Sequence, residues 1–99
     1  MKYEIKEDGG RSALVLREQM TYADRQAFDG LVPGLVKQGK AIVIDMAGLE
    51  YMDSAGLGML LTLRDQADKA RVKVSIRSAQ GDVKELLRLS CFDTLFAFE

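Results

Sequence analysis

The feature that most constrains this chain is the junction between a short apolar run and the amphipathic segment that follows it. Residues 41–44 read Ala-Ile-Val-Ile, and Asp45 ends the run. A segment that is apolar at every position is typical of a strand buried on both faces of a sheet. Residues 59–70 repeat apolar side chains at helical spacing. The sequence therefore predicts a strand-to-helix turn at residues 52–58, Met-Asp-Ser-Ala-Gly-Leu-Gly.

Two further strands are predicted before this junction. Residues 3–6 alternate apolar and charged side chains, and residues 12–16 form a second apolar segment. Between them lies Asp-Gly-Gly at residues 8–10, a combination typical of tight turns. These segments predict an N-terminal β-hairpin.

A first helix is predicted between the hairpin and the central strand. Thr21 and Asp24 have the spacing of a capping box, with a shorter acid than the usual Glu. Pro33 should kink the helix or interrupt it briefly, because proline lacks a backbone N–H and clashes with the preceding turn. Gly39 suits the position just past the end of the helix. The apolar face comprises Phe28, Leu31, Val32, Leu35 and Val36.

The second half of the chain adds two helices and one or two strands. The apolar face of the helix after the junction comprises Leu57, Leu60, Leu61 and Ala67. Residues 72–77 alternate, as in a half-buried strand, and residues 92–98 supply a short final strand or an apolar tail. A third helix opens at Gly81, and its inward face comprises Val83, Leu86, Leu87 and Cys91.

The order of these elements predicts one α/β domain over residues 1–99. We expect a mixed sheet of four or five strands, with residues 41–44 near its centre and helices mainly on one side. The side chains expected to be buried are Leu57, Leu60, Leu61, Phe28, Leu31, Leu35, Val43 and Leu86.

Composition excludes several classes of partner and location. The net charge is −1, and no basic stripe interleaved with aromatic residues is present, which argues against nucleic acid. The charged N-terminal residues lack the apolar stretch of a signal peptide, and no apolar run is long enough for a membrane span. The single cysteine, Cys91, cannot form an internal disulfide, and we expect it to pack in the core. We therefore expect a cytoplasmic protein without membrane insertion.

The chain contains no histidine, which restricts its chemistry. Ser-His-Asp and Cys-His catalysis are excluded, as are metal sites that need histidine. Asp45 and Asp53 are two carboxylates without further ligands, a poor site for a hard cation, so solvation or capping is expected for both. We expect no catalytic residue, no metal and no cofactor.

Two enzyme-like motifs fit only in part. A G-x-S-x-G nucleophile elbow would need glycine where Met52 stands, and it would need a general base. A dinucleotide fingerprint would need a third glycine where Leu61 stands. Gly56 and Gly58 more simply allow the first helical turn to approach neighbouring backbone.

Ser54 stands where the helix is expected to begin. Serine is a preferred N-cap residue, because its hydroxyl accepts hydrogen bonds from backbone N–H groups that have no partner within the helix. A hydroxyl flanked by Asp53 and small residues is also accessible to another protein. From the residues alone, Ser54 is either a helix cap or a group that a partner modifies.

Residues 42–61 resemble the signature of the STAS domain family, the anti-sigma factor antagonists. The shared pattern is an apolar strand ending in Asp, a loop with an apolar residue before Asp-Ser, and a helix opening with Gly-Leu-Gly. The flanking elements follow the family's order as well. One departure lies at residues 17–21, Arg-Glu-Gln-Met-Thr, where many members have a Gly-x-Leu-Asp segment.

The resemblance implies a regulator and phosphoprotein of signal transduction and transcription, and not an enzyme. Its partners would be a HATPase-type serine kinase that doubles as an anti-sigma factor, and a PP2C-type phosphatase that reverses the modification. Ser54 would be the phosphorylated residue. The implied partner-binding residues are Asp53, Ser54, Ala55, Gly56, Leu57 and Gly58. The alternative is a constitutive, unphosphorylated STAS subunit of another assembly, for example a lipid-transport complex.

Overall fold

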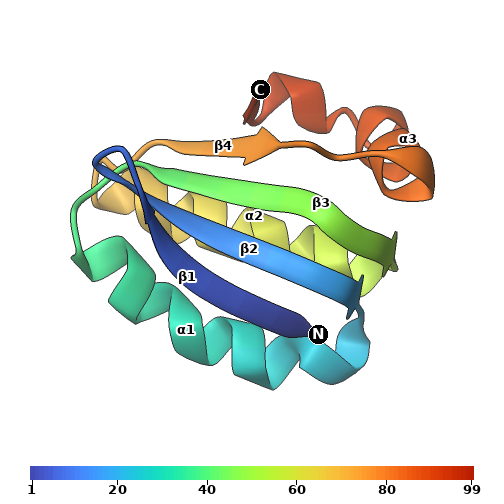
Figure 1. Ribbon diagram of the computed structural model, residues 1–99, viewed down its shortest axis with the longest axis horizontal. Helices are drawn as coiled ribbons and strands as arrows, with labels where there is room; N and C mark the ends of the chain where they lie inside the picture. The colour runs from blue at the N-terminus through green and yellow to red at the C-terminus, as the bar shows by residue number, and fades with distance from the viewer.

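One mixed sheet organises the chain, which a computed structural model describes from Met1 to Glu99. The strands lie in the order β1-β2-β3-β4-β5, with β1 antiparallel to β2 and every other neighbouring pair parallel (Figure 1). Their bounds are β1 (Lys2–Asp8), β2 (Arg11–Met20), β3 (Ile42–Met52), β4 (Val74–Arg77) and β5 (Ala97–Phe98). The predicted hairpin, and the central place of residues 41–44, are confirmed.

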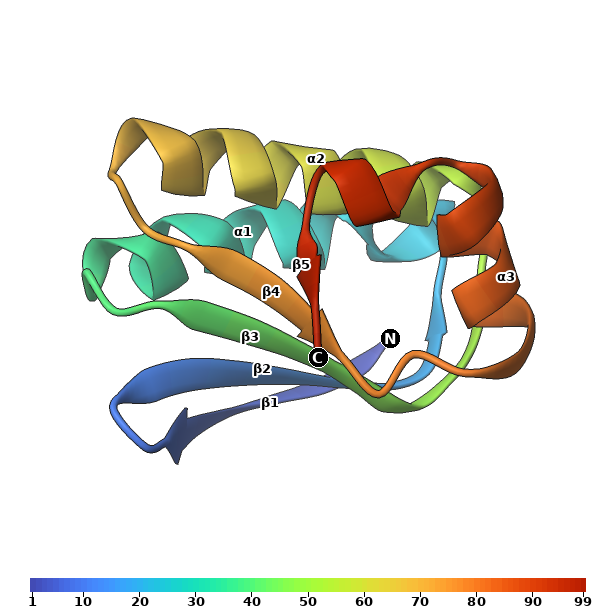
Figure 2. The ribbon, with the colours of Figure 1, turned by 90° about the horizontal axis from the view of Figure 1, so that it is seen from above.

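The longer helices gather on one face of this sheet, as predicted. Figure 2 shows α1 and α2 side by side above the sheet, while α3 lies near the carboxyl ends of β3 and β4. The bounds are η1 (Tyr22–Asp24, a 3-10 turn), α1 (Arg25–Lys37), α2 (Ser54–Lys69), α3 (Gly81–Leu89) and η2 (Phe92–Thr94, also 3-10). None of the helices combines the length and the apolar character needed to cross a membrane.

The core lies between the sheet and the α1–α2 layer. The strand register sets Leu14 beside Ile44, and Ile44 beside Ile76. Side chains that are paired across neighbouring strands point to the same face, so these three residues meet the helices together. All three are fully buried, in one hydrophobic cluster with Phe28 of α1 and Leu60 of α2.

The opposite face of the sheet has charged side chains in place of a helical layer. Val43 points to this face and is nevertheless fully buried, so the expected burial of the central run on both faces is confirmed. Arg77 donates hydrogen bonds to Asp45 at 3.1 Å and to Asp8 at 3.0 Å. Hydrogen bonds from Arg11 and Arg77 hold the pKa of the Asp8 carboxyl below its ordinary value. The stems of such long side chains cover apolar surface while their charged groups stay in water.

Not all of the side chains expected to be buried are fully buried. Phe28, Leu35, Val43 and Leu60 are, whereas Leu31, Leu57 and Leu86 are half-buried at the border of the core. Leu61 is 39% exposed, so its predicted burial is wrong. The buried face of α2 comprises Gly56, Met59, Leu60, Leu63 and Ala67.

Two local predictions at the helices need correction. A brief interruption of α1 at Pro33 is wrong, because the helix continues through Pro33 to Lys37. Both Pro33 and Asp29, whose carbonyl a residue at 33 would normally bond, are exposed, so water can bond that carbonyl. α3 ends at Leu89, and Cys91 takes a left-handed conformation (φ 58°) that exposes its side chain. Phe92, only 3% exposed, fills the core position expected for Cys91.

The rotation of α2 can be tested with two adjacent leucines. Leu60→Ala should lower the free energy of unfolding by about 2–5 kcal/mol, because it leaves a cavity in a packed core. Leu61→Ala should lower it by less than about 1 kcal/mol, because that side chain is partly in water. Urea unfolding of both variants makes the comparison, and equal losses would contradict the orientation described here.

Candidate functional site

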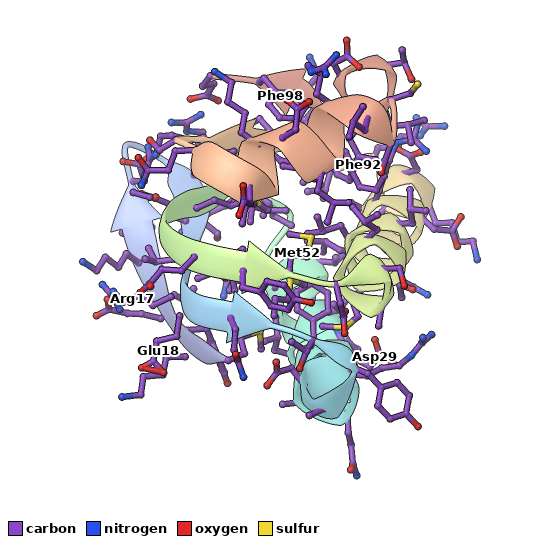
Figure 3. The ribbon with its side chains drawn as sticks, turned by 90° about the vertical axis from the view of Figure 1, so that its right-hand side faces the viewer. Arg17, Glu18, Asp29, Met52, Phe92 and Phe98 are labelled. Carbon is purple, nitrogen blue, oxygen red and sulfur yellow. The ribbon has the colours of Figure 1, made fainter.

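The candidate site lies where β3 passes into α2. β3 runs on to Met52, well beyond Asp45, where the apolar run had suggested that the strand would end. Figure 3 looks onto this end of the molecule, where Met52 lies at the end of β3 beside the start of α2. β2 and β3 run parallel and Met20 pairs with Met52, so the carboxyl ends of both strands lie together here.

The N-cap of α2 is Asp53, and the prediction that Ser54 occupies this position is wrong. Asp53 has an extended backbone (φ −101°, ψ −176°), and its Oδ1 accepts a hydrogen bond from the N–H of Gly56 at 3.1 Å. The strand continues in extended form to the residue before Ser54, so the side chain that faces the first helical turn is the aspartate. The capping role expected for Asp53 is confirmed.

The same carboxylate holds a second element. Oδ2 of Asp53 accepts a hydrogen bond from the N–H of Tyr22 at 3.1 Å, at the first residue of η1. The backbone N–H of Asp53 donates to the carbonyl of Met20 at 3.3 Å. The turn before α1 is fixed in addition by Asp24, whose carboxylate accepts from the N–H of Thr21 at 2.8 Å, as the predicted capping box requires. Asp53 therefore joins the starts of two helical segments.

Ser54 is the first residue of α2, and its side chain is exposed. The hydroxyl makes no hydrogen bond within the protein, because Asp53 serves the first turn in its place. No side chain is hydrogen-bonded to this hydroxyl, and the fold does not use it. The hydroxyl is free to meet another protein.

The two glycines of the turn have different roles. A Cβ on Gly56 would overlap the Met52 side chain and lie 3.0 Å from the carbonyl oxygen of Met20. A Cβ on Gly58 would meet nothing within 4 Å. The expected close approach to neighbouring backbone therefore holds for Gly56 and is wrong for Gly58. Gly56 lies on the buried face of α2 with Met59, Leu60 and Leu63, and Leu61 lies on the outward face.

The six predicted partner-binding residues form one continuous segment at the start of α2. Ser54 is exposed, Gly56 is buried, and Asp53, Ala55, Leu57 and Gly58 are half-buried. Positions three and four apart lie on one face of a helix. Ser54, Leu57, Gly58 and Leu61 therefore form a single outward stripe, which we call the α2 stripe.

Sequence reasoning missed several neighbours of this segment. Tyr22 and Tyr51 are 76% and 53% exposed. Of residues 17–21, where the family pattern differs, residues 17–20 continue β2 as a bulged strand in which Glu18 has a positive φ of 68°, and Thr21 is the N-cap of η1. Glu18 projects outward from β2 in Figure 3. The bulge depends on the pairing of β2 with β3, which the sequence did not reveal.

Asp45 and Asp53, the two carboxylates weighed as cation ligands, already have donors. Asp45 accepts hydrogen bonds from Arg77 and from the N–H of Ala47, while Asp53 caps α2. No group of three or more cysteine or carboxylate side chains is placed to hold a metal ion. The group that remains for chemistry is the exposed hydroxyl of Ser54, at the positive end of α2.

The assignment of the cap predicts effects of different size for two neighbouring substitutions. Asp53→Ala should lower the free energy of unfolding by about 0.5–2 kcal/mol, the cost of losing a helix cap. Ser54→Ala should change it by less than about 0.5 kcal/mol, because no hydrogen bond is lost. Thermal or urea unfolding distinguishes the two, and a larger loss for Ser54→Ala would show that the serine caps α2.

The two glycines provide a second matched pair. Gly56→Ala should destabilise the protein by about 1–3 kcal/mol through overpacking against Met52 and the Met20 carbonyl. Gly58→Ala should stabilise it by about 0.5–1 kcal/mol, because alanine favours the helix and has room. The same unfolding measurement checks both signs.

Comparisons with known proteins agree on the family. The family model described as "Mlab, STAS domain" matches residues 4–97. A STAS-domain containing protein of Pseudomonas aeruginosa (strain UCBPP-PA14) is 28% identical over 89 residues, which cover 90% of this chain and 88% of that protein.

Solved structures are similar in fold at low sequence identity. A putative anti-sigma factor antagonist of Thermotoga maritima has a TM-score of 0.86 at 16% identity, covering 97% of this chain and 84% of its own. The anti-sigma factor antagonist SpoIIAA, at 12% identity, has a TM-score of 0.76 in its unphosphorylated form, covering 99% of this chain and 87% of its own. Bacillus SpoIIAA in the phosphorylated form has a TM-score of 0.74 at 12% identity, covering 99% and 91%. The chain belongs to the STAS domain family, with the SpoIIAA-like fold of the anti-sigma factor antagonists.

Proposed function

We propose that this protein is a phosphorylation-switched antagonist in a partner-switching pathway. It binds a HATPase-type serine kinase that also acts as an anti-sigma factor, the kinase phosphorylates Ser54, and a PP2C-type phosphatase restores the hydroxyl. The protein is the substrate and the binding module, in keeping with a family that is generally non-enzymatic. The observation that carries the proposal is that Ser54 is exposed while Asp53 performs the capping.

Phosphorylation of Ser54 is compatible with the fold. A phosphoserine adds about −1.5 to −2 charges and three acceptor oxygens. The N-terminus of α2 carries partial positive charge that favours an anion there. SpoIIAA in its unphosphorylated and phosphorylated forms resembles this chain to a similar degree, with TM-scores of 0.76 and 0.74. This supports a switch that acts on the partner interface and leaves the fold unchanged.

The α2 stripe supports a partner surface around Ser54. Leu61 is exposed and Leu57 is half-buried, so two apolar side chains line the helix face that begins at Ser54. Gly58 lies between them, and the fold leaves room there for a larger residue. A flat and partly apolar strip is suited to close contact with another protein.

The position of the phosphate within the contact decides how strong the switch is. Changing a complex from almost fully bound to almost fully free requires on the order of 5 kcal/mol of differential affinity. A charge at the rim of an interface is screened by solvent and falls short of this value, whereas a charge inside the contact must be desolvated. We therefore infer that Ser54 and the α2 stripe lie inside the contact with the kinase.

Incubation with the kinase and ATP tests the proposal. The intact mass should increase by one phosphate, and Ser54→Ala should abolish the increase because it removes the acceptor oxygen. Ser78→Ala, which removes another exposed serine, should leave the increase intact. Subsequent PP2C-type phosphatase should restore the original mass.

The contrary result is an unchanged mass with a kinase that is active on other substrates. The protein would then be the constitutive STAS subunit of another assembly. In that case Leu61 and Gly58 would still contact the partner, but Ser54 would not be modified.

A further inference from the structure

β1 is an edge strand. It pairs with β2 on one side only, so its other side offers backbone N–H and C=O groups that have no strand partner. Figures 1 and 2 both show β1 at the outer border of the sheet. Tyr3 and Ile5, on the helix-bearing face of β1, are 45% and 43% exposed.

We propose that this edge pairs with β1 of a second copy of the chain, antiparallel and centred on Ile5. In this register all seven residues of Lys2–Asp8 find a partner. Glu4 of each copy faces Lys6 of the other, and Lys2 faces Asp8. Cross-strand pairs of opposite charge stabilise a sheet, and these four pairs lie together on the face without helices.

The charges also discriminate against neighbouring registers. In the nearest registers that keep the same faces together, each residue lies opposite a residue two positions away from its partner in the register centred on Ile5. One such register sets Glu4 opposite Glu4 and Lys2 opposite Lys6. The other sets Lys6 opposite Lys6 and Glu4 opposite Asp8. Of these three registers, only the one centred on Ile5 pairs the full strand and sets opposite charges together at all four pairs on the face without helices.

The side chains concerned are at the surface and already have charged partners in their own chain. Those of Lys6 and Glu4 are 55% and 45% exposed and form an ion pair at 3.4 Å, and Glu4 also accepts a hydrogen bond from Arg17 at 3.0 Å. Asp8 accepts hydrogen bonds from Arg11 and Arg77, so the charges of the second copy would join these groups at the surface. Ile5 lies on the axis between the copies and would meet its counterpart, which covers apolar surface on both. Charged residues on a sheet edge usually prevent association, but here their order permits one arrangement. The contact does not include the α2 stripe, so the proposal is independent of the phosphorylation switch.

Sedimentation velocity on the full chain tests the proposal, over about 10 µM to 1 mM, where a weak contact associates. The wild type should shift from monomer to dimer as concentration rises. Glu4→Lys and Lys6→Glu, each alone, should weaken dimerisation at least about tenfold, because like charges then face each other. An equimolar mixture of the two variants should dimerise again, since each lysine then faces a glutamate.

Matched controls carry the same charge changes on α3. Glu85→Lys breaks an exposed ion pair with Arg88, as Glu4→Lys breaks one with Arg17, and Lys84→Glu reverses a nearby lysine. Both should dimerise like the wild type, and circular dichroism should show all variants folded. A wild type that remains monomeric at the highest concentration overturns the proposal. So does a mixture of Glu4→Lys and Lys6→Glu that stays monomeric.

Discussion

The arrangement around the site depends on one carboxylate. Asp53 accepts hydrogen bonds from Gly56 at the start of α2 and from Tyr22 at the start of η1, which leads into α1. Both helices cover the same face of the sheet, so this side chain fixes how their starting turns meet the end of β3. Charge-assisted hydrogen bonds are stronger than neutral ones, and here a single anion supplies two of them.

The position of Asp53 has a direct consequence for Ser54. A helix start needs an acceptor for its first N–H groups, and a serine in the N-cap position would be occupied by that task. With the aspartate as cap, the serine is displaced onto the surface of the first turn and keeps its hydroxyl free. Asp53 thus caps α2, and Ser54 remains for the contact that we propose with a partner.

The sequence predicted the architecture well because periodicity reports burial directly. The apolar run at 41–44, the hairpin and the three helices all follow from it. The exact boundaries of helices and strands were harder to predict. Whether Asp53 or Ser54 caps α2 depends on how far β3 stays extended, and β3 is longer than its apolar run. Tertiary packing decides such limits.

Side-chain orientation was similarly hard to foresee where packing overrides pattern. α2 buries Gly56, Met59, Leu60 and Leu63, and Leu61 consequently lies on the side of the helix that faces solvent. The exposure of Cys91 follows from a left-handed residue after α3 that no local motif announced. For the candidate site, the motif pointed to the segment, while the free hydroxyl and the α2 stripe depend on how β3 and α2 pack.

The central claim is that Ser54 serves the partner and not the fold, and Ser54→Asp tests it most directly. The free energy of unfolding and the affinity for the kinase are measured on the same preparation of this variant and of the wild type. The account predicts unchanged or slightly higher stability, because an acid in the first turn favours the helix, together with weaker binding. A variant that binds the kinase as tightly as the wild type, or that loses stability and binding together, would contradict it.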